Sequence, residues 1–244
     1  VYQYLRMTSI VNPHASISLV VMNKEGEIIE EGNWVRTSNK LPRVVEEIKP
    51  HPHGIQLGTL QRMLRESTDR RMTSFLKHNF SGVSPRAAKE ILGMADIEEG
   101  RTPKRIKPEE AKAMITAFQT VKLLKPPMDC LSPIEDLLIK KGLSKAIDSR
   151  FASTVTRSPT VSQGNPFQIE VGLVFGGDLS SEGPIEILRF ANRVPLMYQQ
   201  GGCLLTKALE AVNWKSYGLE QPGGSGIPKG PAAVLVHLAS TNVQ

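Results

Sequence analysis

The segment from Ile185 to Asn242 constrains the fold more than any other part of the chain, because it places a helical pattern between two strand patterns. Residues 185–189 alternate apolar and polar side chains, and residues 232–239 form a nearly continuous apolar run, as in a strand covered on both faces. Five apolar residues between them share one helical stripe: Leu204, Leu205, Ala208, Leu209 and Val212. This order predicts two parallel strands joined by a right-handed crossover helix.

The loop after the expected helix holds a lysine between two aromatic residues. Trp214, Lys215 and Tyr217 fall within four positions, and residues 221–231 are too rich in Gly and Pro to form a packed element. We therefore expect a surface-exposed loop on which Lys215 can neutralise a phosphate. In the alternative interpretation, Trp214 and Tyr217 anchor the loop to the sheet and Lys215 is merely exposed.

Positive charge is concentrated in the middle of the chain. Residues 51–128 carry 14 Lys and Arg against 8 Asp and Glu, a surplus that equals the net charge of +6 of all 244 residues. A localised basic surface favours a polyanionic partner, whereas the alternative is an ordinary solvated helical face.

The same middle segment predicts a small helical domain. Ser84 and Pro85 have the pattern of an N-cap followed by the first helical residue. Free backbone N–H groups at this helix start, with Arg86 and Lys89 beside them, form a candidate phosphate site, although such an end is equally often only a cap. Four short helices are expected around residues 55–64, 72–76, 85–93 and 108–118.

The segments on either side predict mixed structure. Before residue 50, an amphipathic helix stopped by Pro13 precedes two strands joined by a turn at residues 23–26. After residue 128, we expect a helix that is capped by Ser132 and Pro133 and ended by Gly142.

Two further strands are expected at residues 151–156 and 167–175, the second with its apolar residues on one face. Arg189 and Arg193 flank Phe190, and they either bind an anion or pair with carboxylates inside the sheet, the second interpretation being favoured.

Several kinds of site lack the residues they need. Cys130 and Cys203 lie too far apart for paired zinc-ligand spacing, and no metal site is expected. The glycine-rich loops at residues 201–202 and 223–226 lack the Lys-Ser/Thr of a phosphate-binding P-loop. We expect no catalytic residue, no ATP site and no membrane span in these residues.

Three motifs together resemble one known family. RFANRVPLMYQQGGC, NWKSYGL and GPAAVLVHLAST resemble the transducer domain of the B subunit of DNA topoisomerase VI, a type IIB enzyme. The upstream segments LSPIEDLLIKKGL, TRSPTVSQGNPFQIEVGLVFGGDL, HPHGIQLGTLQRML and TSIVNPHASISLV are similar to consecutive pieces of the same subunit. The resemblance therefore covers essentially the whole chain. It implies that the chain is an internal fragment of the B subunit.

The resemblance implies an α+β multidomain fold. Residues 1–49 would be the helix and hairpin that end a GHKL-type ATPase domain, residues 50–128 a helix-two-turn-helix module, and residues 129–244 a truncated α/β transducer domain. The three regions are expected to fold separately, with Pro-rich junctions between them.

The resemblance also implies a function. The intact B subunit would use ATP and Mg to dimerise, capture double-stranded DNA and couple this to double-strand cleavage by the A subunit, in an assembly of two A and two B subunits. The fragment itself is predicted to be inactive. Its DNA contacts would be Trp214, Lys215 and Tyr217, with Arg86 and Lys89 as the second candidate set.

Two other functions are considered: a non-catalytic B-like partner of the meiotic double-strand-break machinery, and a nucleic-acid-binding module without ATP coupling. The expected location is intracellular, either cytoplasmic or nucleoid-associated, or nuclear if the source is plant-like.

Overall fold

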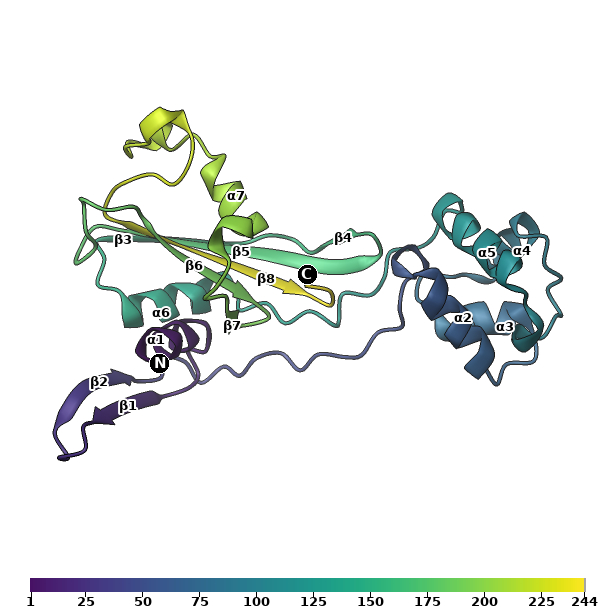
Figure 1. Ribbon diagram of the computed structural model, residues 1–244, viewed down its shortest axis with the longest axis horizontal. Coiled ribbons are helices and arrows are strands. Elements are labelled where there is room, and N and C mark those ends of the chain that lie inside the picture. Colours follow the sequence, from purple (N-terminus) through teal and green to yellow (C-terminus); the bar gives the residue numbers. More distant parts are fainter. Residues whose placement is uncertain (244) are drawn as a thin grey trace. The chain divides into compact units, whose positions relative to one another are not determined.

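The computed structural model describes residues 1–243, which form two compact units. The first unit contains residues 1–44, 132–158 and 168–243, and the second contains residues 45–131 and 159–167. This grouping differs from the three separate regions expected from the sequence, because the N-terminal helix buries Met7, Ile10 and Val11 in the same core as the sheet. Helices and strands together give an α+β fold (Figure 1).

The first unit is built on a mixed sheet. Its strand order is β3-β5-β8-β6-β7, with β4 paired to β5 outside this path. Strand β4 and residues 165–167 of β5 are grouped with the second unit. The strands are β3 (Phe151–Thr156), β4 (Thr160–Ser162), β5 (Asn165–Phe175), β6 (Glu186–Ala191), β7 (Val194–Pro195) and β8 (Ala232–Ser240). Strands β6 and β8 are parallel and are joined through α7 (Leu204–Glu210), which confirms the predicted strand, helix and strand.

Both faces of this sheet are covered (Figure 1). Helices α1 (Tyr2–Val11) and α6 (Asp136–Ala146) pack on one face, where Leu188, Phe190 and Leu235 are buried. Helix α7 and the loop after it pack on the other face. Most of the stripe predicted for α7 is exposed, since only Leu209 of its five residues is buried.

Helix α6 differs from the prediction at both ends. It begins at Asp136 instead of after Ser132, because the backbone N–H groups of Ile134 and Glu135 bind a buried carboxylate and Glu135 has a φ of 79°. It also continues through Gly142, which was expected to end it. A Cβ atom at this position would collide with the carbonyl oxygen of Ile10, so the glycine permits the close approach of α1 and α6.

A two-stranded hairpin follows α1. Strands β1 (Ile17–Met22) and β2 (Ile28–Trp34) are antiparallel, as predicted. The Asn23 side-chain oxygen accepts hydrogen bonds from the backbone N–H groups of Glu25 and Glu27, which fixes the turn.

The second unit is a helical domain of α2 (Leu57–Glu66), α3 (Met72–Asn79), α4 (Pro85–Met94) and α5 (Pro108–Thr120). Phe75, Phe80 and Phe118 form the centre of its core, with ring centroids 5.9 and 5.4 Å apart. Short 3₁₀ turns occur in both units: η1 (Pro52–Gly54), η2 (Pro103–Arg105), η3 (Gln200–Gly202), η4 (Trp214–Tyr217) and η5 (Pro222–Gly224). None of the helices within residues 1–243 has the length and apolar character needed to cross a membrane.

The Gly142 contact gives a first prediction. Replacing Gly142 by Ala should lower the free energy of unfolding of the first unit by about 1–3 kcal/mol, because a methyl group is forced against backbone. Urea unfolding followed by tryptophan fluorescence measures this, since Trp34 and Trp214 both lie in the first unit.

Gly93 provides the matched control, since it is also helical but has open space around it. Gly93→Ala should instead raise helix stability by about 0.5–1 kcal/mol, seen by circular dichroism. A gain of stability in both variants would show that helix propensity, and not the α1–α6 approach, decides the effect.

Candidate functional site

The loop after α7 is anchored by Trp214. The indole ring is buried beside Leu209, Val234 and Val236, and its Nε1–H donates to the carbonyl oxygen of Leu209 at 2.7 Å. Burial of a tryptophan with its N–H satisfied fixes the start of the loop on the sheet. Trp214 therefore has the anchoring role that the alternative interpretation gave it.

A buried glutamine holds the rest of this loop. The Gln221 side-chain oxygen accepts from the Trp214 backbone N–H at 3.1 Å, and its Nε2 donates to the carbonyl oxygens of Val212 and Gly226 at 3.0 and 2.8 Å. The segment was expected to lack packed structure because of its Gly and Pro content. The amide of Gln221 supplies the hydrogen bonds that regular structure would otherwise provide.

Lys215 and Tyr217 are exposed on this fixed support. Tyr217 is 76% exposed, and its ring meets that of Trp214 edge to face at 6.5 Å. Lys215 has no ion-pair partner among the residues that the structure describes. The arrangement can present an ammonium group and a phenol to an extended anion.

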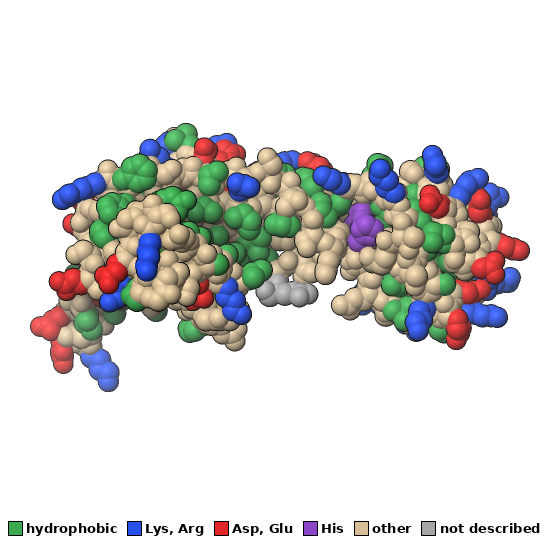
Figure 2. All heavy atoms as spheres, turned by 90° about the horizontal axis from the view of Figure 1, so that it is seen from above, with side chains coloured by type: hydrophobic (Ala, Val, Ile, Leu, Met, Phe, Trp, Pro, Cys, Tyr) green, Lys and Arg blue, Asp and Glu red, His purple; other side chains and the backbone are tan. Residues whose placement is uncertain are grey.

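The second candidate set lies in the other unit. Ser84 caps α4 by accepting from the Ala87 backbone N–H at 3.1 Å, which uses part of the proposed phosphate site. Arg86 is exposed, whereas Lys89 lies 3.5 Å from a carboxylate oxygen of Glu99. Figure 2 shows Lys and Arg side chains over this helical unit, with Asp and Glu among them.

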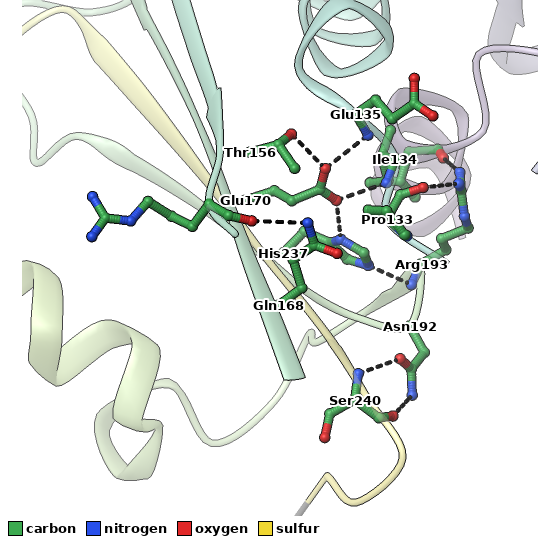
Figure 3. A network of polar contacts seen from close by, with 12 residues as sticks. Pro133, Ile134, Glu135, Thr156, Gln168, Glu170, Asn192, Arg193, His237 and Ser240 are labelled. Carbon is green, nitrogen blue, oxygen red and sulfur yellow. Dashed lines mark hydrogen bonds and ion pairs between the residues drawn. The ribbon is translucent and has the colours of Figure 1, made fainter. Parts of the chain in front are cut away.

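A buried carboxylate and the histidine bound to it link five segments of the first unit (Figure 3). Glu170 on β5 is fully buried and accepts four hydrogen bonds at 2.7–2.8 Å, from Thr156 Oγ1, His237 Nδ1 and the backbone N–H groups of Ile134 and Glu135. His237 Nε2 in turn accepts from the Arg193 backbone N–H at 3.1 Å. His237 is therefore the neutral tautomer that carries its proton on Nδ1, because Nε2 must accept.

Two arginines complete this region. The Arg193 guanidinium donates to the carbonyl oxygens of Val11 and Pro133 at 2.8 and 2.9 Å, and that of Arg189 donates to Leu196 and Tyr198 at 2.9 and 3.1 Å. Both arginines thus have a structural role, with backbone carbonyls in place of the expected carboxylates. Asn192, between them in sequence, exchanges two hydrogen bonds with the backbone of Ser240.

The Glu170 network was not found from the sequence. Burial by itself disfavours the ionised carboxylate, but the hydrogen bonds from His237, Ile134, Thr156 and Glu135 together hold the pKa of Glu170 below its ordinary value. The available signals were a glutamate inside an alternating strand and a histidine inside an apolar one. Neither signal shows that the two side chains meet.

Metal-ligating side chains are not clustered in the part of the chain that the structure describes. No group of three or more His, Cys, Asp and Glu within residues 1–243 is placed to hold a metal ion. Cys130 and Cys203 are free thiols.

The sequence is similar to known proteins of one family. Residues 126–244 match the model of the topoisomerase VI B subunit transducer. The whole chain is 48% identical to the B subunit of type 2 DNA topoisomerase 6 from Methanococcoides burtonii and 45% identical to that from Archaeoglobus fulgidus. It is 35% identical, over 99% of the chain, to the same subunit from Methanothermobacter thermautotrophicus.

The chain belongs to the topoisomerase VI B subunit family. It spans 38%, 39% and 45% of the length of these three relatives. Strands β3 to β8 and helix α7 lie within the matched transducer segment, and so do Glu170, His237, Lys215 and Tyr217. The transducer segment thus contains both the displayed loop and the buried network.

Glu170 gives a second prediction. Glu170→Gln should lower the free energy of unfolding of the first unit by about 3 kcal/mol, because the amide cannot accept all four hydrogen bonds. Exposed Glu182→Gln, in the same unit, is the control and should change little.

The pH dependence follows from the lowered pKa. A carboxylate whose pKa is depressed by folding adds stability above its ordinary value of about 4.5, and this is lost as pH falls through the folded pKa. The difference between the original chain and Glu170→Gln, measured by urea unfolding, should stay constant above pH ~5 and shrink below pH ~4.5. A difference that grows on acidification would mean that Glu170 is protonated in the fold.

Proposed function

We propose that the chain forms part of the B subunit of an ATP-dependent type II DNA topoisomerase. In this function the B subunit couples ATP-driven dimerisation and capture of double-stranded DNA to cleavage and strand passage by the A subunit. The support is the match of residues 126–244 to the transducer model and the identity with relatives named as this subunit.

We also propose a domain assignment for the two segments that precede the transducer segment. Helix α1 and the β1–β2 hairpin would end a GHKL-type ATPase domain, and the helices α2 to α5 would form a helix-two-turn-helix module. Four short helices and a surplus of basic residues support the second assignment. ATP and Mg would be held by other parts of the intact subunit.

The buried network supports the coupling role. Arg193 binds the carbonyl oxygen of Val11, where α1 ends, and that of Pro133, ahead of α6. Glu170 binds the two backbone N–H groups that follow Pro133. Contacts made at helix ends and at the sheet together allow a displacement of α1 to move the sheet as one body.

The single observation that carries the DNA role is the loop that Trp214 and Gln221 hold in place. It presents Lys215 without a competing carboxylate among the described residues, at the end of a crossover between two central strands. Because the loop backbone is already held in place, mainly the Lys215 side chain would lose conformational entropy on binding a phosphate. The contact would be to the DNA backbone, because residues 211–231 form only short 3₁₀ turns and no recognition helix.

This role gives a third prediction. Lys215→Ala should weaken binding to duplex DNA about equally for unrelated sequences, and it should reduce the slope of log K against log salt by about one. Fluorescence anisotropy of labelled duplexes at several salt concentrations measures both quantities.

Lys24→Ala is the matched control, since Lys24 is also an exposed lysine of the first unit but lies in the β1–β2 turn. It should leave the slope unchanged. An unchanged slope for Lys215→Ala, or a loss confined to one DNA sequence, would contradict the proposed contact. No observation favours the meiotic partner or the isolated nucleic-acid-binding module over this function.

A further inference from the structure

A small pocket opens on the helical unit between α2, η2 and the start of α5. Its volume is about 180 Å³. Buried Leu64, Pro103 and Ala111 and half-buried Ile106 form an apolar lining. Small-molecule sites usually measure roughly 300–1,000 Å³, so this pocket is sized for a single aliphatic side chain and not for a metabolite.

Three cations surround this apolar lining. Arg65 comes from α2, Lys104 from η2, and Lys107 from the residue before α5. All three are exposed, and none has an ion-pair partner within residues 1–243. No carboxylate of these described residues belongs to the lining.

Arg65, Lys104 and Lys107 form the rim of the pocket, and of the acidic residues nearest in sequence only Glu110 acts on it, by Coulombic attraction to Lys107. Glu110 is held by the Lys107 backbone N–H at 2.7 Å and by the Arg101 guanidinium at 2.5 Å. Glu66 and Glu109 are exposed and outside the lining. The pocket therefore combines an apolar floor, formed by Leu64, Pro103, Ile106 and Ala111, with a positive rim that makes no ion pair within residues 1–243.

The chemistry of the lining separates two kinds of polyanion. An unstacked nucleic-acid base is usually held against aromatic or histidine rings or an arginine guanidinium, and the lining has no such ring and only Arg65 of the second kind. A DNA duplex offers phosphates to the rim but no aliphatic group to fill the floor. An acidic peptide satisfies both, with an aliphatic side chain for the floor and carboxylates for the rim.

We propose that this pocket binds an acidic peptide segment of a partner protein, which inserts one aliphatic side chain between Arg65, Lys104 and Lys107. The contact is independent of the DNA contact assigned to Lys215, because it uses other residues of another unit. It would recruit a partner to the helical unit while the loop of the transducer segment remains free.

The test uses the full chain and two labelled synthetic peptides. One has a central leucine flanked on each side by glutamates, and the other has alanine in its place. Fluorescence anisotropy at about 0.1 M salt should give a dissociation constant on the order of 10–100 µM for the leucine peptide, and binding at least about tenfold weaker for the alanine peptide.

Matched variants locate the site. Lys104→Gln with Lys107→Gln should weaken the leucine peptide about five- to tenfold and reduce its salt dependence, because two rim charges are lost. Lys77→Gln with Lys122→Gln removes two exposed lysines of the same unit away from the pocket and should leave binding unchanged. Circular dichroism checks that each variant is folded.

Three results would overturn the proposal. The first is no binding of the leucine peptide. The second is equal binding of the leucine and alanine peptides, which would reduce the contact to charge alone. The third is an equal loss for the pocket and control variants. If the two peptides bind equally and an unlabelled DNA duplex displaces both, the rim is a nucleic-acid surface instead.

Discussion

The first unit depends on one buried negative charge. Glu170 lies on a central strand of the sheet, shielded from solvent, and a carboxylate in that position is stable only while its hydrogen bonds are made. Its four donors come from β3, β8 and the two residues before α6. The need to satisfy this charge therefore fixes where α6 begins and which tautomer His237 adopts.

His237 connects the buried charge of Glu170 to the β6–β7 turn and to α1. Its Nε2 holds the turn between β6 and β7 by accepting from the Arg193 backbone N–H, and the Arg193 side chain continues to the end of α1. On the opposite face, Trp214 and Gln221 fix the loop by buried polar contacts of the same kind. The transducer segment thus uses side-chain hydrogen bonds where the backbone is irregular, and it keeps Lys215 and Tyr217 on a support with little freedom.

The sequence predicted the parts of the fold that depend on neighbouring residues. The parallel pair, the hairpin turn at Asn23 and the Ser84 cap all follow from local patterns and were confirmed. The sequence missed contacts between distant residues. Strand β5 was expected to have a single apolar face, but its other face, with Gln168, Glu170 and Val174, is the more deeply buried one. Apolar alternation cannot show this, because a buried polar residue depends on partners far away in sequence.

Gly142 shows how such a distant constraint can rest on a single position. The two helices meet there through the bare backbone of α6 and the carbonyl oxygen of Ile10, atoms that every residue type provides. At this point the spacing of α1 and α6 is therefore set by backbone atoms and not by side chains. Sequence divergence can alter the chemistry of both helix surfaces and still conserve the distance between their axes, provided that residue 142 stays a glycine.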